Sequence, residues 1–144
     1  FAALTTSDDD GSLHSRPMVV LQTAFDGELY FIASRSSRLI ANIRHHSLVN
    51  VAFDHQSKQV YVSLSGTASV VEDQQRLKNL WRPLFASWFT HGATDPDVAL
   101  IHILINHADT WEPLGHPLIH PAGEQPAWVE GGSPTHSLHR RISL

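Results

Sequence analysis

Residues 60–65, with the sequence VYVSLS, alternate between apolar and more polar side chains, and this alternation constrains the fold most directly. Valine and leucine occupy the even positions, whereas tyrosine and serine occupy the odd positions. A period of two places the first set on one face of an extended chain and the second set on the other. The stretch therefore predicts a β-strand with one buried face.

Five further stretches are rich in β-branched and aromatic residues, as strands are. They cover residues 1–6, 12–24, 28–34, 47–55 and 98–105. The last of them is apolar on both faces, which is typical of a buried strand. Between the second and the third stands Asp26-Gly27, a dipeptide that supplies positive φ in tight turns, so it predicts a hairpin there.

Helical spacing is confined to two segments. In the first, Leu39, Ile40 and Ile43 share one face, and Ser36 or Ser37 can act as the N-cap.

The second helix is expected over residues 73–89, with Pro83 kinking or restarting it. Trp81 and Trp88 are seven residues apart, so they are expected on one face of this helix, packed onto the strands. Six strands joined mostly by hairpins, with only two helices, predict a mainly β fold. We expect an antiparallel β-barrel of about six strands with attached helices.

At 144 residues the chain has the length of one domain. We expect the barrel to cover residues 1–112 and, because the chain opens inside an apolar stretch without methionine, a further N-terminal element to precede it. Residues 113–144 contain five of the eight prolines and show no clear periodicity. They predict a loosely packed C-terminal tail rich in proline and histidine.

The composition excludes several classes of partner. A net charge of −4 supplies no general attraction for phosphates, so no nucleic acid is expected. No apolar run reaches the length of a membrane span, so no membrane partner is expected either. The chain has no cysteine, hence no disulfide and no thiolate metal site, which agrees with a cytoplasmic location.

The loop SRSSR at residues 34–38 combines three hydroxyls with two cations at the start of the first helix. Unpaired N–H groups and the positive end of the dipole at a helix start favour anions, and an arginine fork adds to this. The loop therefore suits a phosphate. A solvated turn with a serine cap and two surface arginines is the alternative interpretation.

Arg16 and Pro17, within HSRPM, indicate an interrupted or edge strand, because proline cannot donate to a ladder. An arginine there can reach a phosphate, and the backbone after Pro17 is free for the polar edge of a ring. The alternative is an edge strand with an arginine that reaches out to solvent.

The chain resembles the pyridoxamine 5′-phosphate oxidase-like family in the order and spacing of five segments. These are SLHSRPM, FDGELYFIASRSSRLIANI, VNVAFDHQSKQVYVSLSGTASVVED, LWRPLFASWF and ADTWEP, and the resemblance covers roughly residues 2–112. More narrowly, it is similar to the short branch of general stress proteins with an FMN-binding split barrel. The resemblance implies a homodimer of split β-barrels with FMN in a groove at the subunit interface.

The resemblance assigns cofactor-binding roles to eleven residues. Arg16 matches the arginine that reaches the FMN phosphate and ribityl chain, and Ser37 with Arg38 matches the phosphate-binding pair at the helix start. The other eight match two strand segments beside the isoalloxazine ring and two aromatic positions: Pro17, Met18, Val19, Ile32, Ala33, Ser34, Tyr61 and Trp111.

The sequence departs from the family pattern at several of these positions. Relatives often carry threonine at Ala33, lysine at Arg38, and, in the full oxidases, glutamine at Tyr61. Trp111 is expected to reach the flavin from the far end of the barrel or from the partner subunit. Arg35, the other arginine of the loop, is expected to face solvent or an interface.

The implied function is that of an FMN-dependent oxidoreductase, with no side chain assigned as catalytic. Three alternatives remain: a non-catalytic FMN carrier or sensor, the same fold with a deazaflavin or haem, and a binding module without cofactor whose tail recruits a partner or a metal. No metal site is predicted, because the eleven histidines lack the spacing of known ligand sets. Asp95 and Asp97 are interpreted as turn residues rather than as an acid/base pair.

Overall fold

The computed structural model of the protein describes residues 1–22, 24–113 and 137–144. The strands are β1 (Ala2–Ser7), β2 (Leu13–Met18), β3 (Glu28–Ser34), β4 (Leu48–His55), β5 (Val60–Val71), β6 (Val98–Pro113) and β7 (Ser137–Ser143). The α-helices are α1 (Arg38–His45) and α2 (Gln74–Leu80), and short 3-10 helices cover Gln56–Lys58, Pro83–Ser87 and Gly92–Thr94. Among the described residues, no helix is long and apolar enough to cross a membrane.

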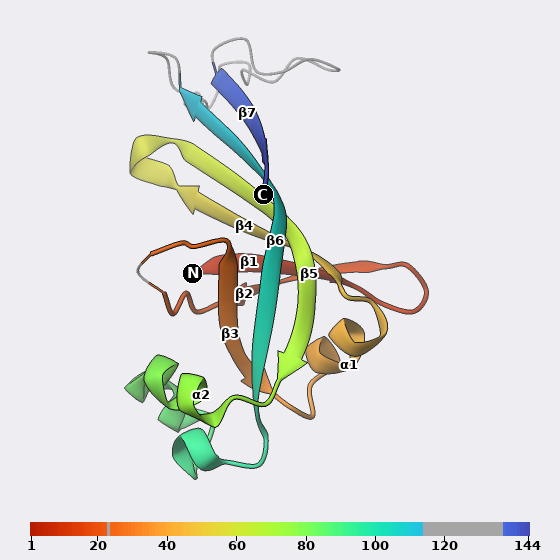
Figure 1. Ribbon diagram of the computed structural model, residues 1–144, viewed down its shortest axis with the longest axis vertical. Coiled ribbons are helices and arrows are strands. Elements are labelled where there is room, and N and C mark those ends of the chain that lie inside the picture. The colour runs from red at the N-terminus through yellow and green to blue at the C-terminus, as the bar shows by residue number, and fades with distance from the viewer. Residues whose placement is uncertain (23, 114–136) are drawn as a thin grey trace, which may run out of the picture.

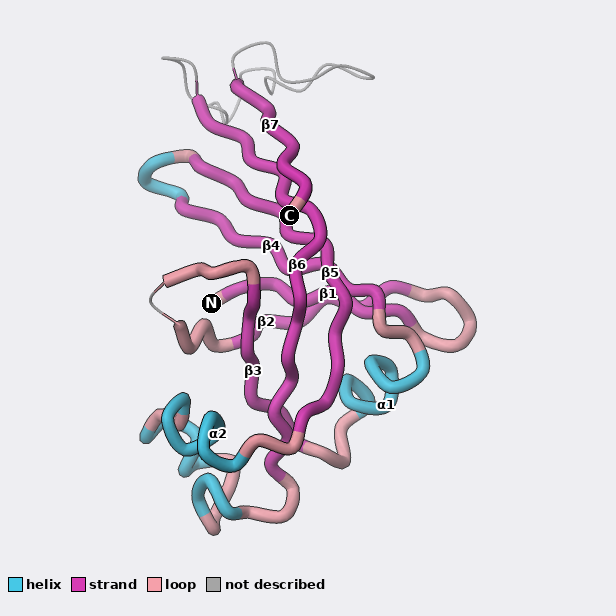
Figure 2. Tube along the Cα trace, viewed as in Figure 1, coloured by secondary structure: helices cyan, strands magenta, loops and turns pink. Residues whose placement is uncertain are grey.

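All seven strands belong to one antiparallel sheet with the order β2-β1-β4-β5-β6-β3, while β7 pairs with β6 beside this path. The sheet curls, and the helices lie outside it (Figures 1 and 2). The predicted mainly β fold, an antiparallel split barrel of about six strands with two helices, is confirmed. The edge position predicted for the strand that carries Pro17 is also confirmed, because β2 is the first strand of the order.

β6 runs through the middle of the structure and pairs with strands on both of its sides (Figure 1). Its first half lies between β5 and β3, and its second half lies between β5 and β7. The pairing with β5 shifts register between Ser65 and Gly66, which allows the long strands to bend.

Two clusters of apolar side chains form the core. The larger one fills the barrel, where the buried residues of α1 close one end. The smaller one lies between β3 and the segment after β5; it contains Leu21, Tyr30, Ile32, Leu77, Phe85, Phe89, Val98 and Leu100. β3 is therefore covered on both faces, which explains its continuous apolar sequence.

The predicted hairpin at Asp26-Gly27 is wrong, because β2 pairs with β1 and β3 pairs with β6. The conformation expected of the dipeptide is nevertheless present: Gly27 has φ +95° and its carbonyl accepts a hydrogen bond from Ile105 N–H at 3.0 Å. The turn thus directs β3 across the sheet to β6 instead of back along β2.

The second helix is shorter than predicted. α2 ends at Leu80, and Arg82 is extended (φ −119°, ψ 144°) because the residue before a proline avoids helical geometry. Trp81 and Trp88 consequently do not share a helical face. Trp81 packs in the smaller core, whereas Trp88 is 64% exposed.

The expected C-terminal tail, residues 113–144, lies mostly outside the described residues. Its last part, Ser137–Ser143, forms β7 and pairs with residues 107–113 of β6. The division of the chain into a barrel and a tail stays a prediction.

Gly66 offers a test of the bend in the sheet. A Cβ at this position would lie 2.4 Å from the carbonyl oxygen of Leu104, and both groups are backbone, so they cannot move apart freely. Gly66→Ala should lower the free energy of unfolding by about 1–3 kcal/mol, as overpacking does. Denaturant titration would measure it. Thr67→Ser, at the exposed next position, should change stability by less than about 0.5 kcal/mol; equal effects of the two changes would contradict a steric role for Gly66.

Candidate functional site

The sheet is open between β2 and β3, the two end strands of its order. A cavity of about 420 Å³ lies at this opening. Its wall on the sheet side consists of six residues predicted to bind the cofactor: Pro17, Met18, Val19, Ile32, Ala33 and Ser34. The other lining residues are Phe85, Trp88, Phe89 and Asp97. Two strand ends that are separate in the sequence thus meet at one cavity.

The free edge of β3 is partly occupied by a side chain. Gln22 accepts a hydrogen bond from Tyr30 N–H at 2.8 Å and donates one to the carbonyl of Glu28 at 3.0 Å, as a neighbouring strand would. Because backbone groups alternate along a strand, Ile32 directs its N–H and carbonyl to the same edge as Tyr30. Ile32 is one of the residues that line the cavity, so we expect these two backbone groups to border it.

A second cavity, of about 520 Å³, lies on the outer side of β2, β1, β4 and β5. Arg16, Pro17 and Tyr61 belong to its lining, so the two cavities meet at Pro17. Trp111 lies opposite Tyr61 on the neighbouring strand, and the two rings are 5.7 Å apart in an edge-on arrangement. The predicted aromatic positions therefore lie at the far side of the second cavity from β2.

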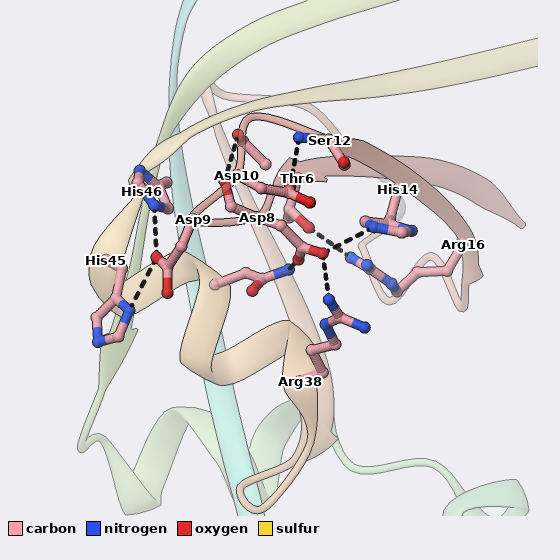
Figure 3. A network of polar contacts seen from close by, with 12 residues as sticks. Thr6, Asp8, Asp9, Asp10, Ser12, His14, Arg16, Arg38, His45 and His46 are labelled. Carbon is pink, nitrogen blue, oxygen red and sulfur yellow. Dashed lines mark hydrogen bonds and ion pairs between the residues drawn. The ribbon is translucent and has the colours of Figure 1, made fainter.

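The predicted phosphate residues lie beside a buried carboxylate (Figure 3). Asp8, 5% exposed, accepts hydrogen bonds from Arg38 and from the amide of Asn42, and His14 Nε2 lies 2.8 Å from it. The Arg38 side chain itself is 74% exposed. Arg38 is thus anchored at one end while the rest of its guanidinium faces solvent.

Arg16 approaches the same group from β2 and donates a hydrogen bond to Thr6 Oγ1 at 2.9 Å. Burial lowers the pKa of Arg16, the charge of Asp8 opposes this, and the charge of Arg38 lowers the pKa further. Two arginines therefore converge near one buried carboxylate. This arrangement concentrates positive charge where the sequence predicted a phosphate, although Asp8 already compensates part of it.

Ser37 is the N-cap of α1, as predicted. Its hydroxyl accepts a hydrogen bond from Ile40 N–H at 3.4 Å, and its own N–H donates to the carbonyl of Ser34 at 3.0 Å. The loop is held from the other side by Asp97, which accepts from Ser34 Oγ at 2.5 Å and from Ser36 N–H at 2.9 Å. These hydrogen bonds lower the pKa of Asp97.

Arg35 does not simply face solvent, which corrects one of the two placements expected for it; a place at an interface stays a prediction. It donates two hydrogen bonds to Glu72, at 2.7 and 3.2 Å, and a third to the carbonyl of Val98 at 3.1 Å. Arg35 therefore ties the loop to the ends of β5 and β6, and its charge is balanced by Glu72. Of the two arginines of the loop, Arg38 has the more exposed side chain.

The described histidines form no group of three or more with acidic residues that would suit a metal ion. His45 and His46 both contact Asp9, at 3.3 and 2.8 Å. His102 stacks on Tyr30 with ring centroids 4.9 Å apart, and its Nε2 lies 3.3 Å from Glu28.

Several residues of the site were not predicted to belong to it, among them Asp8, Asp97 and Trp88. Asp8 and Asp97 stand in turn-like stretches, and only the fold shows that each holds a loop or an arginine. Trp88 was expected to pack on the barrel, yet it lines the cavity with an exposed ring. The only sequence signal for it was Pro83, which removes this segment from the helix.

Comparisons with known proteins identify the family of the chain and agree with its fold. The family model for proteins described as pyridoxamine 5′-phosphate oxidase like matches residues 1–134, so the chain belongs to that family. A general stress FMN/FAD binding protein from Xanthomonas citri is 30% identical, with a TM-score of 0.64 over 76% of this chain and 79% of that one. General Stress Protein 26 from Bacillus anthracis is 26% identical, with a TM-score of 0.68 over 76% and 81%.

Protein bli-3 of Neurospora crassa is 29% identical over 113 residues, which is 72% of this chain. The match covers 54% of that protein, so the chain spans about half the length of this curated relative.

Asp97 gives a prediction about acid stability. Its pKa is lowered in the folded protein, chiefly by Ser34 and then by Ser36, so its stabilising effect is complete above the unfolded pKa near 3.8 and is lost as the pH falls further. Asp97→Asn should therefore lower the Tm above about pH 5, and the difference from the native protein should shrink steadily toward pH 2. Thermal unfolding followed by circular dichroism at several pH values measures this. A Tm difference that is independent of pH would show that the charge of Asp97 is not involved.

Proposed function

We propose that this protein binds FMN at the opening between β2 and β3 and acts as a flavin-dependent oxidoreductase. The observation that carries the proposal is the cavity of about 420 Å³, whose sheet wall consists of Pro17, Met18, Val19, Ile32, Ala33 and Ser34. The family and the FMN/FAD binding protein of Xanthomonas citri support a flavin as the ligand.

The residues at the opening fit each part of FMN. The apolar side chains and the free edge of β3 suit a planar ring with a polar edge, because backbone N–H and carbonyl groups can pair with it. Arg16 lines the second cavity next to Pro17, the residue that the two cavities share, and Arg38 lies close to Arg16 at the start of α1. Both arginines can donate to a phosphate through charge-assisted hydrogen bonds.

The flavin would supply hydride and electron transfer. The tasks of the chain are to fix the phosphate, to present the ring edge to Ile32, and to keep one face of the ring against apolar side chains. Asp97 is a poor general base, because its hydrogen bonds from Ser34 and Ser36 lower its pKa.

We further propose a homodimer with FMN between the subunits. The outer faces of β1, β2, β4 and β5 carry the second cavity, which is lined mainly by short side chains and by the exposed Phe1 and Tyr61. The Tyr61 side chain is 42% exposed, so a second copy could cover it. Sedimentation equilibrium with and without FMN measures this directly: a monomer under both conditions would contradict the dimer.

A non-catalytic role as an FMN carrier or sensor is the second candidate, because the lining offers the ligand a site without an evident acid or base. Turnover of a nicotinamide or of a pyridoxine phosphate by the FMN-loaded protein would argue against it. Absorbance spectra of the purified protein distinguish flavin from deazaflavin and haem.

Arg38 is the residue to test for the phosphate. Arg38→Ala should weaken FMN binding roughly 10- to 100-fold, because a hydrogen bond to a charged group contributes about 1.5–3 kcal/mol. Riboflavin has the same ring system and no phosphate, so its affinity should change little. Titration followed by flavin fluorescence measures both ligands.

Two further arginines serve as controls. Arg44 is exposed in the last turn of α1, away from the helix start, and Arg44→Ala should leave both affinities unchanged. Arg35→Ala should lower the Tm, because it breaks the contacts with Glu72 and Val98, but keep the ratio of FMN to riboflavin affinity. If Arg38→Ala weakens FMN and riboflavin binding equally, Arg38 does not bind the phosphate. If the native protein does not bind FMN, the proposed function is wrong.

A further inference from the structure

The wall of the cavity opposite the strands is aromatic. The 3-10 helix Pro83–Ser87 and the residues after it supply Phe85, Trp88 and Phe89 to the lining. Phe85 and Phe89 are buried, at 3% and 5% exposure, whereas Trp88 is 64% exposed and its ring centroid lies 6.0 Å from that of Phe85. The two buried phenylalanine rings thus support the exposed indole ring of Trp88 at the mouth of the cavity.

This aromatic wall is attached to the barrel at its start. Arg82 donates a hydrogen bond to the carbonyl of Leu21 at 2.6 Å, which ties the segment to the chain between β2 and β3. Phe85 also packs against Trp81, with ring centroids 5.4 Å apart. The position of Trp88 relative to β2 and β3 therefore depends on the core and not on a free loop.

One ionised carboxylate shares this cavity with Trp88. Asp97 lines it and accepts from Ser34 and Ser36, which hold its pKa below the usual value. The charge of Arg35 contributes to the lowered pKa of Asp97, but Arg35 is itself engaged with Glu72 through two hydrogen bonds. The mouth of the cavity thus combines an indole face with a negative charge, whereas Arg16 and Arg38 are not among its lining residues.

We propose that Trp88 and Asp97 form a subsite for a planar aromatic ring that carries a positive charge, such as an N-alkylpyridinium. The indole face attracts a cationic ring by cation–π interaction, and Asp97 adds Coulomb attraction while it repels an anionic ring. The inference rests on the proposed function in one respect: the ring would be the redox partner of the flavin in the same cavity. The substrates expected for this subsite are therefore cationic or neutral heteroaromatic rings.

Three small probes with the same ring and different charge test the subsite. They are 1-methylnicotinamide (cationic), nicotinamide (neutral) and nicotinate (anionic). Binding to the protein as purified, and again to the FMN-saturated protein, is measured by calorimetry and by quenching of tryptophan fluorescence. The affinity should fall in that order, with the cation bound at least roughly 10-fold more tightly than the anion, and 0.5 M salt should reduce the preference.

Two substitutions separate the contribution of the Trp88 ring from that of the Asp97 charge. Trp88→Leu should weaken all three probes roughly 5- to 10-fold or more, and the fold should persist because Trp88 is mostly exposed. Asp97→Asn should bring the cation and the anion to within about 2-fold of each other while nicotinamide still binds. Leu84→Ala is the matched control, since Leu84 is 45% exposed on the same 3-10 helix and does not line the cavity.

Equal affinity for the three probes, or unchanged affinity in Trp88→Leu, would overturn the subsite. If Asp97→Asn fails to fold, the salt dependence of the native protein decides: a cation preference that does not fall with salt overturns the role of Asp97. Binding of the probes without FMN binding would refute the proposed function alone. FMN binding without charge selectivity would refute the subsite alone.

Discussion

The candidate site exists because the sheet does not close between β2 and β3. Each of these strands pairs on one side only within the path of the sheet, so its other edge carries backbone groups that need partners. Pro17 has no N–H group, so the β2 edge carries one donor fewer. The side-chain amide of Gln22 forms hydrogen bonds with two backbone groups of the β3 edge. At Ile32 and its neighbours the edge borders a cavity, and this is where a ligand with a polar rim can complete the pairing.

Charges of both signs lie near the opening. Arg16 and Arg38 converge on the buried Asp8 beside α1 (Figure 3), and Asp97 lines the same cavity as Trp88. Each charge is fixed by neighbours: Thr6 holds Arg16, Asp8 anchors Arg38, and the loop hydroxyls and N–H groups hold Asp97. Under the proposed function, the phosphate of FMN would lie toward the two arginines and away from Asp97.

The sequence predicted what depends on local chemistry. Pro17 indicated an edge strand and Ser37 a helix start, and both are present because each rests on the hydrogen-bonding capacity of one residue. Local sequence patterns did not predict which strands pair when the strands are distant in the sequence. Asp26-Gly27 predicted a hairpin, but β3 pairs with β6, about 70 residues further along the chain. The burial of Asp8 and the role of Asp97 likewise depend on contacts 30 to 63 residues apart.

Hydrogen–deuterium exchange with and without FMN tests the central claim most directly, because the amide of Ile32 faces the opening and should gain a partner when the ring binds. The account predicts slower exchange in the peptides that contain residues 17–19 and 32–38, and a larger effect there than in residues 60–65 of β5. Protection confined to β4 and β5, with unchanged exchange at Ile32, would contradict a flavin site between β2 and β3.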